Sequence, residues 1–255
     1  MKFVRFAIRG DTAVRNGVLE GDVVKETSGD LFSPPQFTGK TYAVDAVRLR
    51  APLVPRHIIG IGKNFVPEGA EKPPIPDMPI LFFKPLTSVI GPDDAVLLPA
   101  GTDKIKFESE LAVIIGREAK NLKPAEVKDA TFGYTVANDV TAFNYFHPDG
   151  HWTIGKAFDT FSPIGPAIET ELDLGRIRIQ ARVNGELKQD APLERMIMPI
   201  GEMISYISRF MTLMPGDVIL TGSPAGSDFV GHGDTVECRI DGIGSLVNPF
   251  VSPDM

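Results

Sequence analysis

The sequence predicts a mostly β protein of the α+β class, with few helices and a small N-terminal β unit. Asn184-Gly185 joins two strand-like runs and is a strong signal for a type I′ hairpin. A second hairpin is expected within TVECRIDGIGSLVNPF. Further strand-like apolar runs recur at short spacing, and they include ILFFK, FESELAVIIG, GYTVANDV, RIRIQARV and DVILTG. Helical patterns are rare between them, so the chain is not an alternating βαβ fold.

The N-terminal part of the chain has a β pattern of its own. KFVRFAI alternates between apolar and polar side chains, and GVLEGDVV is typical of a short hairpin that turns at Glu20-Gly21-Asp22. Two prolines then lead into the strand HIIGIG. We therefore place a boundary near Ala51, with a small β domain at 1–50 and a larger domain at 51–255.

Two helices are expected. KPAEVKDA is short and amphipathic, and PIGEMISYISRFMTL has Pro199 at a plausible first helical position and ends before Pro215-Gly216. The second segment carries an apolar stripe at helical spacing, which we interpret as core packing: Ile200, Met203, Ile204, Ile207 and Met211.

Composition limits the class of partner. The formal net charge is -7 and the pI is about 5.2, which argues against nucleic acid or an anionic membrane as the main partner. Cys238 is the only cysteine, so no intramolecular disulfide can form. The N-terminal segment is not typical of a signal peptide, and no apolar run approaches the roughly 20 residues that span a bilayer. We expect a soluble, cytoplasmic protein without a membrane or nucleic-acid partner.

Three carboxylates form the first candidate site. Glu108 and Glu110 are two residues apart beside a buried strand, so their side chains share one face. Asp139 ends the strand GYTVAN. Exposed strand-edge charges are the ordinary alternative for such residues. Together, however, the three side chains make an all-oxygen ligand set that suits Mg²⁺, and also Mn²⁺ or Ca²⁺.

Two further segments can complete this site. Lys156, in GKAFDTFSPIGP, is either a surface charge or a counter-charge to the metal site that also meets a substrate carboxylate. The turn at Thr221, Gly222 and Ser223 offers a hydroxyl and backbone N–H groups at the end of a buried strand. Such donors bind an oxyanion or carboxylate, although the turn alone is an ordinary one.

With these motifs in place, the chain from about Ile58 to Phe250 resembles the fumarylacetoacetate hydrolase family. The motifs that carry the resemblance follow the family's order: FFKP, FESELAVIIG, GYTVANDV, GKAFDTFSPIGP, VNGELKQD, SRFMTLMPGDVILTGSPAG and IDGIGSLVNP. The resemblance implies a mixed β-sandwich roll and a homodimer.

The resemblance also implies a ligand set and substrate contacts. Glu108, Glu110 and Asp139 match the residues that hold a divalent ion, generally Mg²⁺, and Lys156 matches a residue beside that ion. The turn at Thr221 matches a contact for the substrate carboxylate. We also assign substrate contacts to two residues of matching motifs, Asn64 and Lys84.

The chemistry implied is that of a small anionic 2-oxo acid. A divalent ion with open positions acts as a Lewis acid that stabilises an enolate, and Lys156 adds positive charge. Decarboxylation, enol–keto isomerisation and hydrolysis of an acylpyruvate all use this device. The base distinguishes them.

The sequence departs from the family pattern at the positions that usually supply the catalytic base. Residues 66–79 carry five prolines and are expected to form a loop or lid. Family hydrolases usually carry a water-activating His–Glu pair on this lid, whereas the matching positions here hold Glu68 and Glu71. Phe143-Asn144 replaces the family's Arg-Asp. These changes favour decarboxylation or isomerisation over hydrolysis.

Two alternatives stay open. The chain can be an acylpyruvate-type hydrolase, because His147 and His151 follow Asp139 on a loop and either can replace the lid histidine as a base. Each can also be an ordinary surface histidine. The second alternative is a non-catalytic family member that keeps the ion only to bind a carboxylate ligand. Candidate catalytic residues are therefore Lys156, Glu71, His147 and His151.

Overall fold

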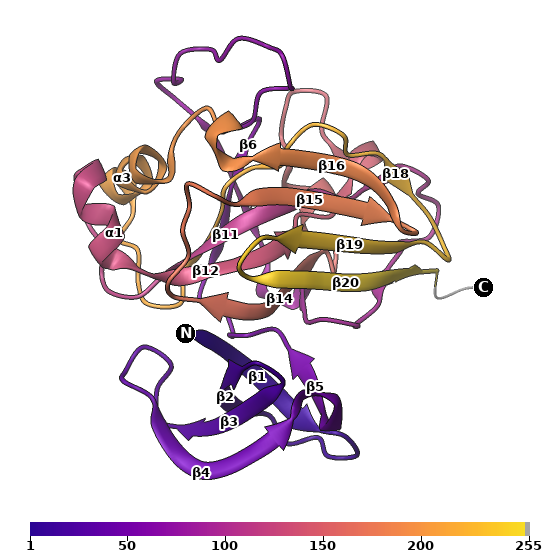
Figure 1. The fold of residues 1–255 in the computed structure, drawn as a ribbon. Helices are drawn as coiled ribbons and strands as arrows, with labels where there is room; N and C mark the ends of the chain where they lie inside the picture. The colour runs from indigo at the N-terminus through magenta and orange to yellow at the C-terminus, as the bar shows by residue number, and fades with distance from the viewer. Residues whose placement is uncertain (253–255) are drawn as a thin grey trace.

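The structure, a computed structural model, describes residues 1–252 of the chain. Strands dominate it and helices are few, as predicted (Figure 1). The largest sheet contains β1 Lys2–Ile8, β2 Arg15–Glu20, β3 Val23–Ser28, β4 Gln36–Ala43, β5 Val47–Arg50, β6 Ile58–Gly62, β7 Ile80–Lys84, β8 Val89–Ile90, β11 Ser109–Ile115, β12 Thr131–Asn138, β14 Ser162–Glu169 and β17 Val218–Leu220.

Two smaller sheets accompany it. One contains β9 Val96–Leu97, β15 Arg178–Val183, β16 Glu186–Pro192, β19 Thr235–Ile240 and β20 Gly244–Val251. The other contains β10 Ile105–Lys106, β13 Thr141–Ala142 and β18 Phe229–Val230. The α-helices are α1 Val127–Ala130, α2 Thr153–Lys156 and α3 Ile200–Phe210. Short 3-10 helices lie at Val44–Ala46, Leu86–Ser88, Pro124–Glu126, Phe143–Tyr145 and Leu193–Arg195.

The central strand β11 is buried on both faces. Leu111 and Val113 point to one face, and Ala112 and Ile114 point to the other. The sequence of a strand that is covered on both faces is a continuous apolar run rather than an alternation of apolar and polar residues. On the first face Leu111 packs into the core that the five-stranded sheet covers, which includes Ile179 of β15.

Helices α1 and α3 cover the neighbouring part of that face. Met203, Ile204 and Ile207 are completely buried against strand residues such as Val113. The apolar stripe predicted for this helix is therefore core packing. Pro199 precedes the helix, which begins at Ile200, so it occupies the capping position rather than the first helical position.

The N-terminal strands continue the main sheet. β1 pairs antiparallel with β14 through Lys2↔Glu169 and Phe3↔Ile168, so strands β1 to β5 lie along one edge of the larger unit (Figure 1). β4 was not predicted, because seven of its eight residues are exposed and the strand has no apolar face.

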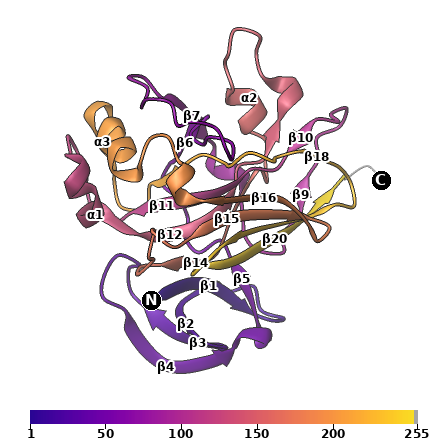
Figure 2. The same cartoon turned by 45° about the horizontal axis from the view of Figure 1, so that its top comes forward.

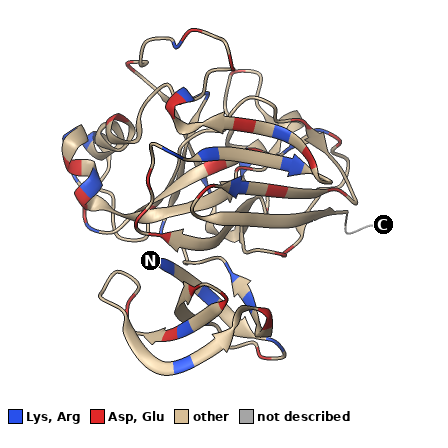
Figure 3. Cartoon of the chain, viewed as in Figure 1, with Lys and Arg blue, Asp and Glu red and all other residues tan. Residues whose placement is uncertain are grey.

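The surface carries both signs of charge. Acidic and basic residues are interspersed along β15, β16 and β19 (Figure 3). Among the described residues, no helix is both long and apolar enough to cross a membrane.

Helix α2 carries the site lysine and lies apart from α1 and α3. Figure 2 shows it near β7 and β10, on the other side of the view from α1 and α3. The short Gly-Lys end of α2 is buried at Gly155 and Lys156, so the lysine points inward from this position.

Candidate active site

Three carboxylates converge because β11 and β12 pair antiparallel. Ser109 lies opposite Asn138, which places Glu108 and Asp139 next to each other just beyond the paired segment. The Asp139 N–H donates to the Glu108 carbonyl at 2.9 Å, and Glu108 N–H donates to Asn138 Oδ1 at 2.9 Å. One oxygen from each of Glu108, Glu110 and Asp139 lies within 4.8 Å of the others. The predicted convergence of the three side chains is therefore confirmed.

Two buried lysines neutralise part of this charge. Lys156 Nζ donates to Glu108 Oε2 at 2.6 Å and forms a short ion pair with Asp139 Oδ2. Lys84, at the end of β7, donates to Asp139 Oδ1 at 2.5 Å and to the Val140 carbonyl at 3.0 Å. Asp139 therefore has one lysine on each oxygen.

The contacts between Asp139 and the two lysines shift the pKa values of all three groups. Burial alone would raise the pKa of Asp139, but Lys156 and Lys84 hold it below its ordinary value. Burial likewise opposes the charged form of Lys156, yet Asp139 and Glu108 raise its pKa well above the usual range. Burial prevails at Lys84 and lowers its pKa.

Glu110 differs from the other two carboxylates. It has no lysine partner among the described residues, and its Oε2 accepts a 2.7 Å hydrogen bond from Gly222 N–H. Burial, followed by the charges of Asp139 and Glu108, raises its pKa well above the ordinary value. A buried carboxylate without a counter-charge is costly. Three carboxylates against two lysines leave a deficit of positive charge, and an all-oxygen donor set fits a divalent ion.

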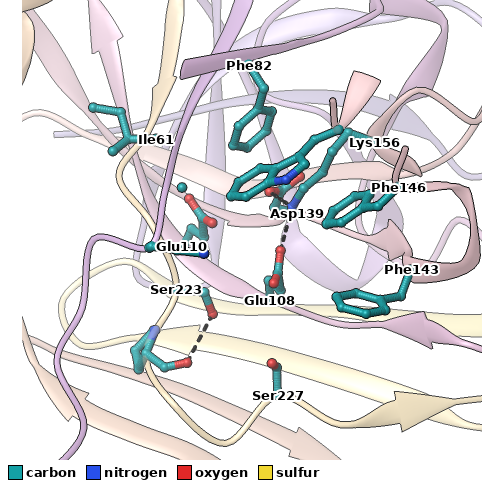
Figure 4. Close-up of a pocket in the computed structure, with 14 residues that line it drawn as sticks. Ile61, Phe82, Glu108, Glu110, Asp139, Phe143, Phe146, Lys156, Ser223 and Ser227 are labelled. Carbon is teal, nitrogen blue, oxygen red and sulfur yellow. Dashed lines mark hydrogen bonds and ion pairs between the residues drawn. The ribbon is translucent and has the colours of Figure 1, made fainter. Parts of the chain in front are cut away.

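The carboxylates open into a cavity of about 370 Å³. One side, the aromatic wall, consists of Phe82, Phe143, Phe146 and Trp152. The small polar residues Ser223 and Ser227 lie on another side (Figure 4). The lining residues are Ile61, Gly62, Lys63, Phe82, Glu108, Glu110, Asp139, Phe143, Phe146, Trp152, Lys156, Ser223, Pro224 and Ser227.

The aromatic wall holds α2 in place. Trp152 stacks on Phe146 with ring centroids 5.3 Å apart and planes 4° apart, and its centroid lies 6.0 Å from that of Phe82. Lys156 Nζ lies 4.8 Å from the centroid of Phe82. A Cβ on Gly62 would lie only 2.1 Å from the Trp152 ring, so glycine is required for this close approach. The wall thus fixes the direction in which Lys156 enters the site.

The turn after β17 serves two purposes. Thr221 is fully buried and its hydroxyl donates to the Leu111 carbonyl at 2.8 Å, so it is directed at the main chain rather than at the cavity. Gly222 orients Glu110 through its N–H. Only Ser223 of the three predicted turn residues lines the cavity.

Asn64 and Lys84 lie behind the cavity rather than in its lining. The Asn64 amide donates to the carbonyls of Met198 and Thr221 and accepts from Met198 N–H at 2.8 Å. All of its polar atoms are thus used to join main-chain segments. Lys84 is 3% exposed, is not among the residues that line the cavity, and contacts Asp139 through its ammonium group. Neither residue is therefore among those that line the cavity, and their assignment as substrate contacts stays a prediction.

The predicted base residues are not among those that line the cavity. Glu71 is exposed on the proline-rich loop, together with Glu68. His147 and His151 are exposed on the loop before α2, where His147 N–H donates to the His151 carbonyl at 3.0 Å. The structure therefore brings together Lys156, the three carboxylates and Ser223, but none of the predicted bases.

Gln189 was not predicted and lies at the back of this site. It is completely buried on β16, and its Oε1 accepts from Ser109 N–H, between the two glutamates, at 3.0 Å. Its Nε2 donates to Ser223 Oγ at 2.8 Å and to the Pro224 carbonyl at 2.6 Å. Gln189 thereby fixes the glutamate segment relative to the Ser223 turn. The one feature of the sequence that could have indicated Gln189 is its position in the family motif VNGELKQD.

Comparison with known proteins decides the family. The model for the fumarylacetoacetate (FAA) hydrolase C-terminal domain matches residues 57–251. The chain belongs to the fumarylacetoacetate hydrolase family. Residues 1–52 match a second model, Rv2993c-like, N-terminal.

Family relatives have several described activities. The chain is 42% identical over 233 residues to protein Rv2993c of Mycobacterium tuberculosis, which covers 89% of this chain and 87% of the relative. It is 40% identical over 219 residues to the mitochondrial oxaloacetate tautomerase fahd2 of Xenopus laevis, which covers 80% of this chain and 69% of the relative. This family therefore includes enzymes of small organic acids.

Solved structures of the family share the whole fold. The 5-carboxymethyl-2-hydroxymuconate delta-isomerase of Mycobacterium smegmatis has a TM-score of 0.92 at 39% identity and covers 99% of this chain and 100% of its own. Maleylpyruvate hydrolase of Sphingobium sp. SYK-6, in complex with manganese(II) ion and pyruvate, has a TM-score of 0.82 at 29% identity, with 99% of each chain covered. The predicted fold of the family is confirmed.

Proposed function

We propose that this protein is a divalent-metal-dependent enzyme that shifts a proton in small 2-oxo acids or their enols, as an isomerase or tautomerase. Decarboxylation of a 2-oxo diacid uses the same site and is included in the proposal. The observation that carries it is the set of three converging carboxylates with Lys156 at the base of a small cavity. The isomerase and tautomerase relatives support the same reaction class.

We propose Glu108, Glu110 and Asp139 as the residues that hold the ion. When bound, the ion would polarise the oxygen on which enolate charge develops. Lys156 is held in the protonated form by its two carboxylate contacts, so it donates hydrogen bonds and positive charge and does not act as a base. Ser223 offers a hydroxyl to the substrate, and the aromatic wall offers an apolar surface to its carbon skeleton.

Hydrolysis of a carbon–carbon bond is the second candidate. It is supported by the likeness to maleylpyruvate hydrolase, and it needs a base that activates water. Glu71, His147 and His151 all lie outside the cavity lining, so the loops that carry them would have to move. If His147→Ala and His151→Ala together leave cleavage of acetylpyruvate unchanged, neither histidine is that base.

The ion, the assembly, the location and the domain boundary also belong to the proposal. We propose Mg²⁺ as the resident ion, with Mn²⁺ and Ca²⁺ as substitutes, because the ligands are hard oxygens. We also propose a homodimer, a cytoplasmic location, and a domain boundary near Ala51.

A substrate panel tests the proposed reaction. Oxaloacetate, acylpyruvates and hydroxymuconate-type dienes are each assayed for tautomerisation, decarboxylation and hydrolysis, with Mg²⁺ and with EDTA. We expect a proton shift or decarboxylation that EDTA abolishes. Metal-dependent binding of 2-oxo acids without any turnover would contradict an enzyme and favour a carboxylate-binding protein. Hydrolysis as the dominant reaction would favour the second candidate.

A further inference from the structure

Lys63 lines the same cavity as the three carboxylates, immediately after β6. It differs from Lys156, whose ammonium group is engaged by Glu108 and Asp139. Within residues 1–252, no carboxylate lies in ion-pair distance of Lys63 and its side chain donates no hydrogen bond. Lys63 is thus the cavity's one cation that is available to an incoming anion, among the residues described.

The main chain holds Lys63 in an unusual conformation. Its φ is 57°, in the left-handed region that disfavours a side chain with a Cβ. On one side Gly62 is packed beneath Trp152, and on the other Asn64 is tied to Met198 and Thr221 by hydrogen bonds. An ordered non-glycine residue kept in this region, at the rim of a cavity, is a reason to look for a functional role.

Charge balance indicates what Lys63 would bind. Lys84 and Lys156 offset two of the three carboxylates, and a divalent ion would then leave a single net positive charge in the interior of the site. This charge matches the one carboxylate of a 2-oxo monoacid. Lys63 adds a second positive charge from another element, the end of β6 rather than α2, so a second carboxylate can be matched as well.

We propose that Lys63 binds the distal carboxylate of the substrate, and that the substrates are therefore 2-oxo dicarboxylates rather than monoacids. This inference rests on the proposed function, whose metal site binds the 2-oxo acid end. The cavity volume, about 370 Å³, lies near the lower end of the usual range for ligand sites and fits a small diacid. Lys63 thus determines specificity and takes no part in the chemical step, because it contacts the distal carboxylate and not the reacting carbons.

Binding calorimetry with paired ligands tests the proposal. The protein is saturated with Mg²⁺ and titrated with 2-oxoglutarate against 2-oxopentanoate, and with 2-oxoadipate against 2-oxohexanoate. Each pair differs in the distal carboxylate, and two lengths are used because the reach of Lys63 is not fixed by the main chain. We expect the wild type to bind at least one diacid about tenfold more tightly than its monoacid, the effect of one charge-assisted contact.

Three variants isolate the role of Lys63. Lys63→Gln removes the charge and leaves a polar side chain one atom shorter, and it should bring the diacid and monoacid affinities to within about twofold of each other. Lys63→Arg keeps the charge and should retain most of the diacid preference. Lys128→Gln on α1, outside this cavity, makes the same change in net charge and should leave the preference unchanged.

The outcomes separate this inference from the proposed function. Mg²⁺-dependent binding of the monoacids supports the metal site whatever happens at Lys63. If wild type binds both members of each pair equally, or if Lys63→Gln keeps the diacid preference, the role of Lys63 is overturned while the proposed function stands. If no 2-oxo acid binds, the proposed function fails and the inference fails with it. A fall in monoacid affinity in Lys63→Gln as large as the fall in diacid affinity would also overturn the role of Lys63, because a contact with the distal carboxylate alone cannot affect a monoacid.

Discussion

Lys156 and Asp139 form an ion pair that is almost completely shielded from solvent, with 4% and 1% of their side chains exposed. A buried pair contributes little net stability, because the cost of removing two charges from water offsets their attraction. The presence of this ion pair is therefore better explained by a role in the proposed reaction than by a contribution to folding stability. Lys84 forms a second buried ion pair with the other oxygen of Asp139, and the same argument applies to it.

Replacing Lys156 by methionine should affect both activity and stability. The substitution removes the donor to the developing negative charge, so we expect kcat to fall by at least about 100-fold. It also leaves part of a buried carboxylate cluster uncompensated, and should lower the free energy of unfolding by about 3 kcal/mol. Substrate assays and urea denaturation check the two effects.

The matched control is Lys188→Met. Lys188 pairs with Glu186 at 2.8 Å on the surface, where the glutamate side chain is 72% exposed. Its loss should change stability by less than about 1 kcal/mol and leave kcat unaltered. Activity within tenfold of wild type in Lys156→Met would contradict the electrostatic role of Lys156.

Glu110→Gln should affect the metal-free and metal-bound protein in opposite directions. Glutamine keeps an acceptor for Gly222 N–H and removes a buried charge that has no lysine partner. The metal-free variant should therefore be as stable as wild type or more stable. The rise in Tm on adding Mg²⁺ should shrink, because a ligand at 100 times its Kd stabilises by about 2.7 kcal/mol only where the site is intact.

Thermal unfolding with and without Mg²⁺ measures both parts of that prediction. Glu118→Gln, at an exposed position, is the control and should keep the full rise in Tm. An unchanged Mg²⁺ response in Glu110→Gln would remove Glu110 from the ligand set.

Gly62→Ala should reduce turnover without removing metal binding. The added Cβ would lie 2.1 Å from the Trp152 ring, which must move and disturb its stack on Phe146. Because α2 follows Trp152 directly, Lys156 should shift, and a displacement of about 1 Å can cost about 100-fold in rate. Steady-state kinetics and a Mg²⁺ titration separate the two effects.

Gly231→Ala is the control for that substitution. No heavy atom lies within 4 Å of the added Cβ at Gly231, so kinetics like those of wild type are expected. Full turnover in Gly62→Ala would show that the aromatic wall does not position Lys156.

Glu26→Gln should make the stability of the N-terminal strands less dependent on pH. Burial alone would raise the pKa of Glu26, but the hydroxyl of Tyr42, 2.9 Å from Oε2, and the charge of Lys40 hold it below its ordinary value. A depressed folded-state pKa contributes stability above the unfolded pKa, and this contribution is lost as the pH falls through the folded pKa. We expect the variant to be about 0.5–1 kcal/mol less stable at neutral pH.

Denaturation curves of wild type and Glu26→Gln across the acidic range check this sign. The two should converge as the pH falls, and turnover at neutral pH should be equal, since Glu26 lies on β3, remote from the cavity lining. A difference that grows in acid would contradict the assignment.

Sequence patterns predicted those parts of the site that depend on local order. Strand alternation puts Glu108 and Glu110 on one side, and an antiparallel neighbour brings Asp139 to them. The apolar stripe of α3 follows from helical spacing in the same way, with Met203 and Ile207 buried.

Features that depend on long-range packing were not predictable. Gln189 contacts Ser109 across 80 residues, and Lys84 contacts Asp139 across 55 residues, so no spacing rule links them. From the sequence alone, a glutamine or a lysine in a strand is expected to lie at the surface. The orientation of Asn64 and Thr221 depends on hydrogen bonds to distant main-chain carbonyls, which sequence spacing does not reveal.

Metal binding by the three carboxylates is tested most directly by counting bound Mn²⁺ with electron paramagnetic resonance. Wild type is compared with Glu108→Gln, Glu110→Gln and Asp139→Asn, each first shown to be folded. We expect a single ion per chain in wild type, bound at least about tenfold more weakly in each variant. Wild-type protein that binds no Mn²⁺, or variants that bind it as tightly as wild type, would show that the three carboxylates do not form a metal site.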